Sequence, residues 1–241
     1  MQLYTSTEIE KFQQDLPYLI QISDWIRNFL AKPHPDLGRS GKVCPFVPHS
    51  LKSDTIQLAV IRPKTSIQED VEGIVKGYRD VFLQTEPTFG DTAIYKVFLL
   101  LFPDVNVEHT SALIDDVQKK LKPFFVEAGL MLGEFHMRNQ SPGLHNPNFR
   151  PLRSPIPMLA IRFMVEQDLP FLKLSGDEPQ IRIKYLEIYL KRFANNFKDE
   201  KNYHQAVLAL NTAKQELDAI SCTSDGNLVK SEKEIEFLST C

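Results

Sequence analysis

Two irregular segments of this chain, residues 34–48 and 130–157, contain the side chains best suited to chemistry. Both are rich in proline, and no acidic residue occurs between Glu134 and Glu166 although four arginines do. Cationic, proline-stiffened sequence that also carries histidine and cysteine is typical of a site rather than of a core. The candidate site residues in and near these segments are His34, Arg39, Cys44, Glu134, His136, Arg150, Arg153 and Arg162.

Cys44 is the candidate reactive atom of the first segment. Its thiolate could serve as a haem ligand or as a nucleophile, because the nearby Arg39 and Lys42 would favour the charged form. The alternative is a small buried hydrophobic side chain, the commonest role of a lone cysteine. His34 lies between two prolines and could be a metal ligand, a proton carrier or a helix C-cap.

Glu134 and His136 lie two residues apart in a predicted strand, so they face the same side of the sheet. A carboxylate beside an imidazole is suited to acid–base chemistry or to orienting a ligand. The alternative is a solvent-exposed pair on an edge strand. On the predicted helix 107–127, we interpret the adjacent pair Asp115-Asp116 as part of a solvated helix face.

Three arginines, Arg150, Arg153 and Arg162, give the firmest signal. The planar guanidinium fork matches carboxylates and phosphates. With no acid nearby, these cations must pair with distant carboxylates, face water or bind an anion. Arg162 lies within a predicted strand, where it could face a pocket or the solvent.

Composition excludes several classes of function. A net charge of −3 over 241 residues argues against bulk nucleic-acid binding. No apolar run approaches the roughly 20 residues that span a bilayer, and we expect no signal peptide. Three cysteines without zinc spacing fit a reducing, cytoplasmic location. Nucleotide-binding, serine-hydrolase and zincin motifs are absent from the sequence.

The hydrophobic pattern predicts an α+β fold in which a mixed sheet of about four strands packs with helices. We expect one domain over residues 1–220, with a long proline-rich loop and two C-terminal helices, and a polar, mobile tail over 221–241. Residues 33–53 are expected to be irregular. Predicted strands cover 55–62, 93–102, 130–136 and 158–165, and predicted helices cover 6–30, 67–84, 107–127, 180–197 and 202–220.

The segment Val43-Cys44-Pro45-Phe46, placed between the first helix and the first strand, resembles the corresponding segment of the YqcI/YcgG-like haem proteins. That group includes haem-dependent enzymes that hydroxylate a guanidino or amine nitrogen. The resemblance implies haem b held by the Cys44 thiolate and an N-hydroxylated product. The pattern HPxLGRxGxVCPF, followed by Arg150-Pro151-Leu152-Arg153, also resembles an uncharacterised bacterial family.

These observations lead to two main hypotheses. The first is a haem-thiolate monooxygenase of small-molecule biosynthesis, with iron on Cys44, arginines on the propionates or the substrate carboxylate, His34 or His136 in the distal pocket, and an electron donor as partner. The second is a non-haem protein that binds an anionic metabolite through the arginines. A third interpretation is an interaction module whose proline-rich loop packs on a partner chain. The oligomeric state is open in all three.

Overall fold

The computed structural model describes residues 5–63, 68–174, 178–194 and 197–238, with side chains as far as Ser221. Within it the chain divides into two compact units, Met1–Met164 and Val165–Cys241. We did not expect a division inside residues 1–220. Whether the two units fold together as the single predicted domain stays a prediction.

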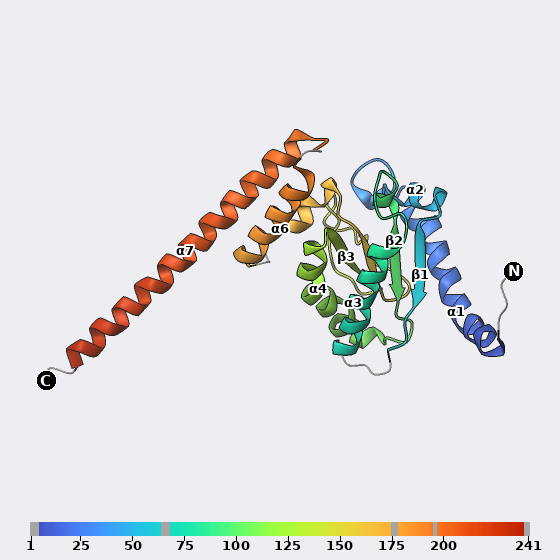
Figure 1. The fold of residues 1–241 in the computed structure, drawn as a ribbon, viewed down its shortest axis with the longest axis horizontal. Helices are drawn as coiled ribbons and strands as arrows, with labels where there is room; N and C mark the ends of the chain where they lie inside the picture. The colour runs from blue at the N-terminus through green and yellow to red at the C-terminus, as the bar shows by residue number, and fades with distance from the viewer. Residues whose placement is uncertain (1–4, 64–67, 175–177, 195–196, 239–241) are drawn as a thin grey trace. The chain divides into compact units, whose positions relative to one another are not determined.

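The first unit is built on a four-stranded mixed sheet with the strand order β1-β2-β4-β3 (Figure 1). β1 (Ile56–Val60) pairs in parallel with β2 (Val97–Leu101), and the crossover that parallel pairing requires runs through α3 (Gln68–Gln84). β4 (Met158–Phe163) is antiparallel to both β2 and β3 (Leu130–Phe135). The predicted α+β fold with a four-stranded mixed sheet is therefore confirmed.

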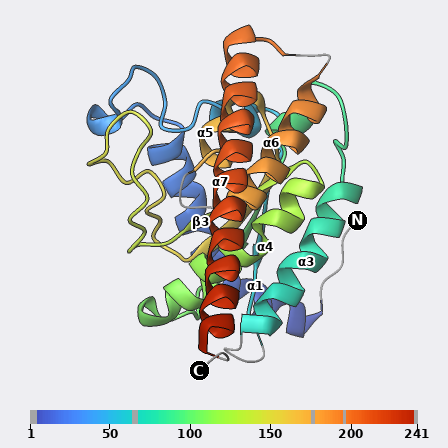
Figure 2. The same cartoon turned by 90° about the vertical axis from the view of Figure 1, so that its left-hand side faces the viewer.

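Both faces of the sheet are buried, which explains the unbroken apolar run of β2. Phe98 and Leu100 pack with α3 and with α4 (Asp116–Glu127) on one face. Leu99 and Leu101 pack on the other face with α1 (Ser6–Trp25) and with α2 (Val47–Lys52). Figures 1 and 2 show α3 and α4 side by side, and Figure 1 shows α1 on the opposite side of the strands. Alternate residues of one strand thus stabilise two helical layers.

The helices differ from the expected ranges in two ways. α2 lies within residues 33–53, which we expected to be irregular. Its Pro48 occupies the first helical turn, where the missing backbone N–H is not needed, so this proline begins a helix rather than preventing one. The predicted helices 6–30 and 107–127 each contain a π-helical turn, η1 (Ile26–Leu30) and η5 (Ser111–Asp115).

The second unit contains α5 (Leu169–Leu172), α6 (Pro179–Phe193) and α7 (Glu200–Leu238), so the two predicted C-terminal helices are confirmed. The buried Glu166 carboxylate accepts hydrogen bonds from the backbone N–H groups of Lys198 and Asp199, just before α7 begins. α7 continues to Leu238, past the residue where we expected the polar tail to begin. The side chains beyond Ser221, including Cys222 and Cys241, lie outside the described residues, and the mobility of 221–241 stays a prediction.

The two segments with candidate site residues meet on the first unit. The Asn146 amide donates a hydrogen bond of 2.8 Å to the Asp36 carbonyl, and the His34 ring lies 4.7 Å from the Phe149 ring. Leu37 and Phe149 belong to one small buried cluster. Figure 2 shows the two segments, in blue and yellow, as neighbouring loops. We call their contact the loop junction.

Gly38 makes the loop junction possible. Its φ of +77° lies in the left-handed region, which side chains rarely adopt. A Cβ atom at this position would lie 2.5 Å from the backbone carbonyl oxygen of His145. Only a residue without a side chain therefore allows the two loops to approach this closely.

We expect Gly38→Ala to lower the free energy of unfolding by about 1–3 kcal/mol, through backbone strain and the clash with His145. Gly73→Ala is the matched control, since Gly73 lies exposed in α3 and an added methyl group there would have no neighbouring atom within 4 Å. At this control position alanine should stabilise the helix by about 0.5–1 kcal/mol. Urea denaturation of both variants measures the difference. Equal stability of the two variants would count against the loop junction.

Candidate functional site

An open pocket of about 670 Å³ lies beside the loop junction. Its walls come from the end of α1, from η1 and from both loops. The lining residues combine aromatic rings, two guanidinium groups, one carboxylate and two carboxamides; they are Trp25, Phe29, Asp36, Asn146, Asn148, Phe149, Arg150 and Arg153. Charged groups beside aromatic surface are typical of a small-molecule site.

The aromatic rings form a continuous wall. Trp25 and Phe29 stack with their centroids 5.7 Å apart, and Phe29 lies 6.2 Å from Phe149. His34 extends this wall behind Phe149 and does not line the pocket itself. Trp25 immediately precedes η1, and π-helical turns of this kind are frequent at functional sites.

Arg150 and Arg153 are held by carbonyl groups of their own loop. Arg150 Nη1 donates to the carbonyls of Pro147 and Phe149 at 2.5 and 3.1 Å. Arg153 Nε donates to the Asn139 carbonyl at 3.1 Å, and its Nη2 donates to the Gln140 side chain at 3.3 Å. Among the described residues, neither arginine has a carboxylate partner, and the buried Arg150 Nε has no hydrogen-bond partner. Their charge is therefore not compensated by a carboxylate of the described residues.

Arg39 and Cys44 lie outside this pocket. Arg39 donates to the carbonyls of Ser40, Lys42 and Val43, so its guanidinium group holds its own turn together. The half-buried Cys44 packs against the apolar cluster between α1 and the sheet, and its backbone N–H donates to the Leu30 carbonyl. The predicted iron ligand therefore does not line the pocket that contains Arg150 and Arg153.

Arg162 lies near the opposite end of β4 from the pocket. It pairs in register with Val97 of β2 and Met131 of β3, and its Nη1 donates to the Phe163 carbonyl at 3.0 Å. The pocket loop leads into the start of β4 instead. Arg162 therefore does not join Arg150 and Arg153 in one anion clamp.

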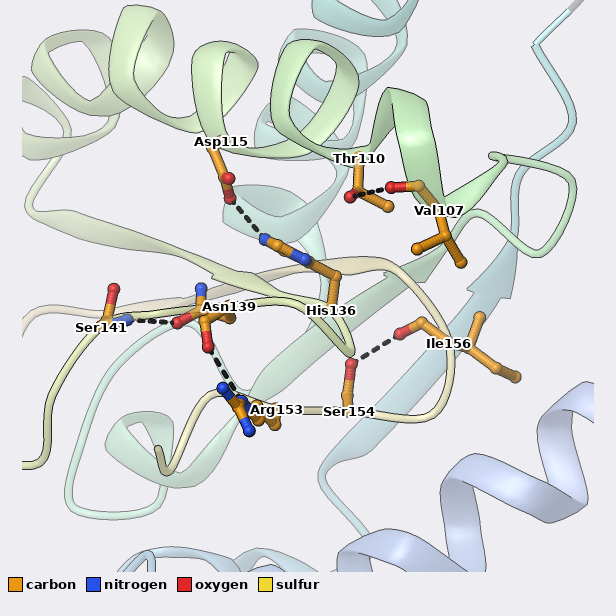
Figure 3. Close-up of polar contacts among 9 residues, drawn as sticks. All are labelled: Val107, Thr110, Asp115, His136, Asn139, Ser141, Arg153, Ser154 and Ile156. Atoms are coloured by element: carbon orange, nitrogen blue, oxygen red, sulfur yellow. Dashed lines mark hydrogen bonds and ion pairs between the residues drawn. The ribbon is translucent and has the colours of Figure 1, made fainter. Parts of the chain in front are cut away.

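His136 lies on the other face of the sheet and is buried (Figure 3). Its Nε2 lies 2.9 Å from Oδ1 of Asp115, whose side chain is 37% exposed. The partner of His136 is therefore Asp115 rather than Glu134, and the burial of His136 also excludes a fully solvent-exposed pair. His136 Nδ1 is buried and has no hydrogen-bond partner among the described residues. The imidazole therefore contacts the Asp115 carboxylate through Nε2 alone.

A comparison of the chain with protein-family models identifies its family. A model described as a domain of unknown function, DUF6875, matches residues 19–204. The chain belongs to the DUF6875 family. No curated protein matches it, and no solved structure does. The matched part of the DUF6875 chain includes the pocket and the His136–Asp115 pair. In the described part of the chain, no helix is long and apolar enough to cross a membrane.

Glu134 also faces the α4 side of the DUF6875 sheet, two residues before His136. Burial raises the pKa of its carboxyl group above the ordinary value, and the negative charge of Asp115 raises it further. A hydrogen bond from the Asn139 side chain acts in the opposite direction. A carboxyl group with a raised pKa beside a buried imidazole is suited to proton transfer. Glu134 and His136 nevertheless lie on a different face of the sheet from the pocket.

Asp115 could not be recognised from sequence because of a π-helical turn. At regular α-helical spacing Asp115 lies far from the apolar face set by Leu113 and Val117. In η5 the Asp116 N–H donates to the Ser111 carbonyl, five residues back rather than four. This wider turn changes the direction in which Asp115 points relative to a regular α-helix. Trp25 and Phe29 line the pocket but were not among the candidate site residues. Their spacing of one helical turn, just before the cationic loop, is a sequence feature that could have identified them.

We expect Asp115→Ala to lower the free energy of unfolding by about 1–3 kcal/mol, because both nitrogens of the buried imidazole then lack a partner. Asp116→Ala is the control at the adjacent, exposed position, where loss of the helix-dipole interaction should cost about 0.3–1 kcal/mol. Urea denaturation measures the free energy of unfolding of each variant, and the comparison holds if the dependence of that free energy on urea concentration is the same in both. An equal loss of stability in the two variants would contradict a stabilising contact between Asp115 and the buried His136.

Proposed function

We propose that this protein binds a small carboxylated metabolite in the open pocket, with Arg150 and Arg153 receiving the carboxylate. The observation that carries the proposal is the pair of guanidinium groups that line the pocket with no carboxylate partner among the described residues. Arginine presents parallel N–H donors in a planar fork, which matches the two oxygens of a carboxylate.

The loop carbonyls orient these cations without neutralising them. Arg150 uses Nη1 for its backbone contacts, and Arg153 uses Nε and Nη2. Nη2 of Arg150 and Nη1 of Arg153 make no hydrogen bond to the described residues and can donate to a ligand. Side chains that are already fixed lose less conformational entropy on binding, which favours affinity.

The alternative haem proposal fits the observed positions less well. A haem-thiolate site needs the cysteine sulfur at an open cavity and cationic groups at the propionates. The half-buried Cys44 packs against the apolar cluster between α1 and the sheet and is not a lining residue of the pocket. The guanidinium group of Arg39 is engaged by three carbonyls of its own turn. These positions favour anionic-metabolite binding over haem ligation.

Absorption spectroscopy separates the two proposals. We expect haem-supplemented wild-type protein and its Cys44→Ala variant to give the same spectrum, with no Soret band that depends on the cysteine. Cys44→Ala is suitable because its small side chain leaves the backbone contact with Leu30 in place. A Soret band that is present in the wild type and lost in Cys44→Ala would overturn the binding proposal in favour of a haem-thiolate protein.

Arg153→Ala should weaken binding of carboxylic acids about ten- to a hundredfold, the equivalent of about 1.5–3 kcal/mol for a hydrogen bond to a charged group. The measurement is a calorimetric titration with a panel of amino acids and simple carboxylic acids. Arg138→Ala is the matched control, because Arg138 is an exposed arginine at the start of the same loop that does not line the pocket. Equal affinities in the two variants would contradict the proposal.

A further inference from the structure

The pocket has three chemically different walls, and together they define a ligand more narrowly than a carboxylate. We propose that the ligand is an α-amino acid with an aromatic side chain. Its carboxylate lies on Arg150 and Arg153, its ammonium group on Asp36, and its ring against the aromatic wall. This inference rests on the proposed function, because it assigns the carboxylate to the same two arginines.

The aromatic wall supplies the surface for the ring. Trp25 and Phe29 are half-buried, so part of each ring faces the pocket, whereas Phe149 is 7% exposed and holds the wall in place. Trp25 is itself fixed from behind by an edge-to-face contact with Phe135 of β3, at 5.9 Å between centroids. Aromatic pairs add favourable energy beyond the burial of area, so this wall favours a flat aromatic group over an aliphatic one of similar size.

Asp36 supplies the negative pole. It is the acidic residue among those that line the pocket, and its side chain is 70% exposed. Both of its backbone groups are held, since its N–H donates to His34 Nδ1 at 3.2 Å and its carbonyl accepts from Asn146 at 2.8 Å. The loop junction therefore fixes this carboxylate on one loop and the two arginines on the other.

The charge pattern selects a zwitterion. A dicarboxylate would bring a second negative charge toward Asp36, and a simple amine would leave the charges of Arg150 and Arg153 without an anion. Like charges held together in a partly desolvated site are unfavourable. An α-amino acid places one charge of each sign on a single carbon, which matches a pocket with poles of both signs.

Four probes separate the three walls: L-phenylalanine, L-alanine, 3-phenylpropanoate and phenethylamine. Isothermal titration calorimetry of the whole protein should give L-phenylalanine the highest affinity, with each of the other three about tenfold or more weaker. Asp36→Asn should weaken L-phenylalanine about tenfold and leave 3-phenylpropanoate unchanged. Phe29→Leu should reduce the advantage of L-phenylalanine over L-alanine, and Arg138→Ala should change neither affinity.

The outcomes distinguish this inference from the proposed function. If L-alanine binds as tightly as L-phenylalanine and Arg153→Ala still weakens both, the aromatic assignment is overturned and the carboxylate site stands. If 3-phenylpropanoate equals L-phenylalanine, or loses affinity equally in Asp36→Asn, the ammonium site is overturned. If none of the carboxylates binds, or Arg153→Ala has no effect on those that do, the proposed function itself fails.

Discussion

The close approach of two loops at Gly38 is the constraint on which the candidate site depends. The missing side chain at this residue lets the His145 carbonyl come within a distance that any Cβ atom would block. Asn146 then bonds to the Asp36 carbonyl, and Phe149 stacks near His34. Asp36 lies on one loop, and Arg150 and Arg153 lie on the other. The loop junction is therefore required to bring the acidic and basic side chains into one pocket.

A second constraint explains how the arginines can be ordered and still available. A long irregular loop leaves many backbone carbonyls without partners in regular secondary structure, and buried carbonyls need donors. Arg39, Arg150 and Arg153 supply such donors within their own segments. Because a carbonyl carries no net charge, these contacts fix the guanidinium groups and leave their charge uncompensated. The sequence pattern indicated carboxylates, water or anions as partners of these arginines, but not backbone carbonyls.

The sheet and its main helices could be predicted because each leaves a periodic apolar pattern. The apolar run of β2 is typical of a strand buried on both faces, and β2 lies between β1 and β4. Local departures from a regular apolar pattern could not be predicted from that pattern. α2 begins with a proline, and η5 turns Asp115 toward His136 against the α-helical spacing. The candidate site was predicted in part: both loops and the pocket residues Arg150 and Arg153 were named, but sequence distance gave no means of seeing that the two loops meet, or that Cys44, Arg162 and His136 do not line the pocket.

The most direct test of this account is a backbone amide NMR titration of the whole protein with L-phenylalanine. A ligand in a pocket formed by both loops must perturb residues of both, so we expect saturable shift changes at residues 34–39 and at 146–153, with one common dissociation constant. The amides of Glu134 and His136, on the other face of the sheet, should change little. Shift changes confined to one loop, or centred on His136, would contradict a binding site at the loop junction.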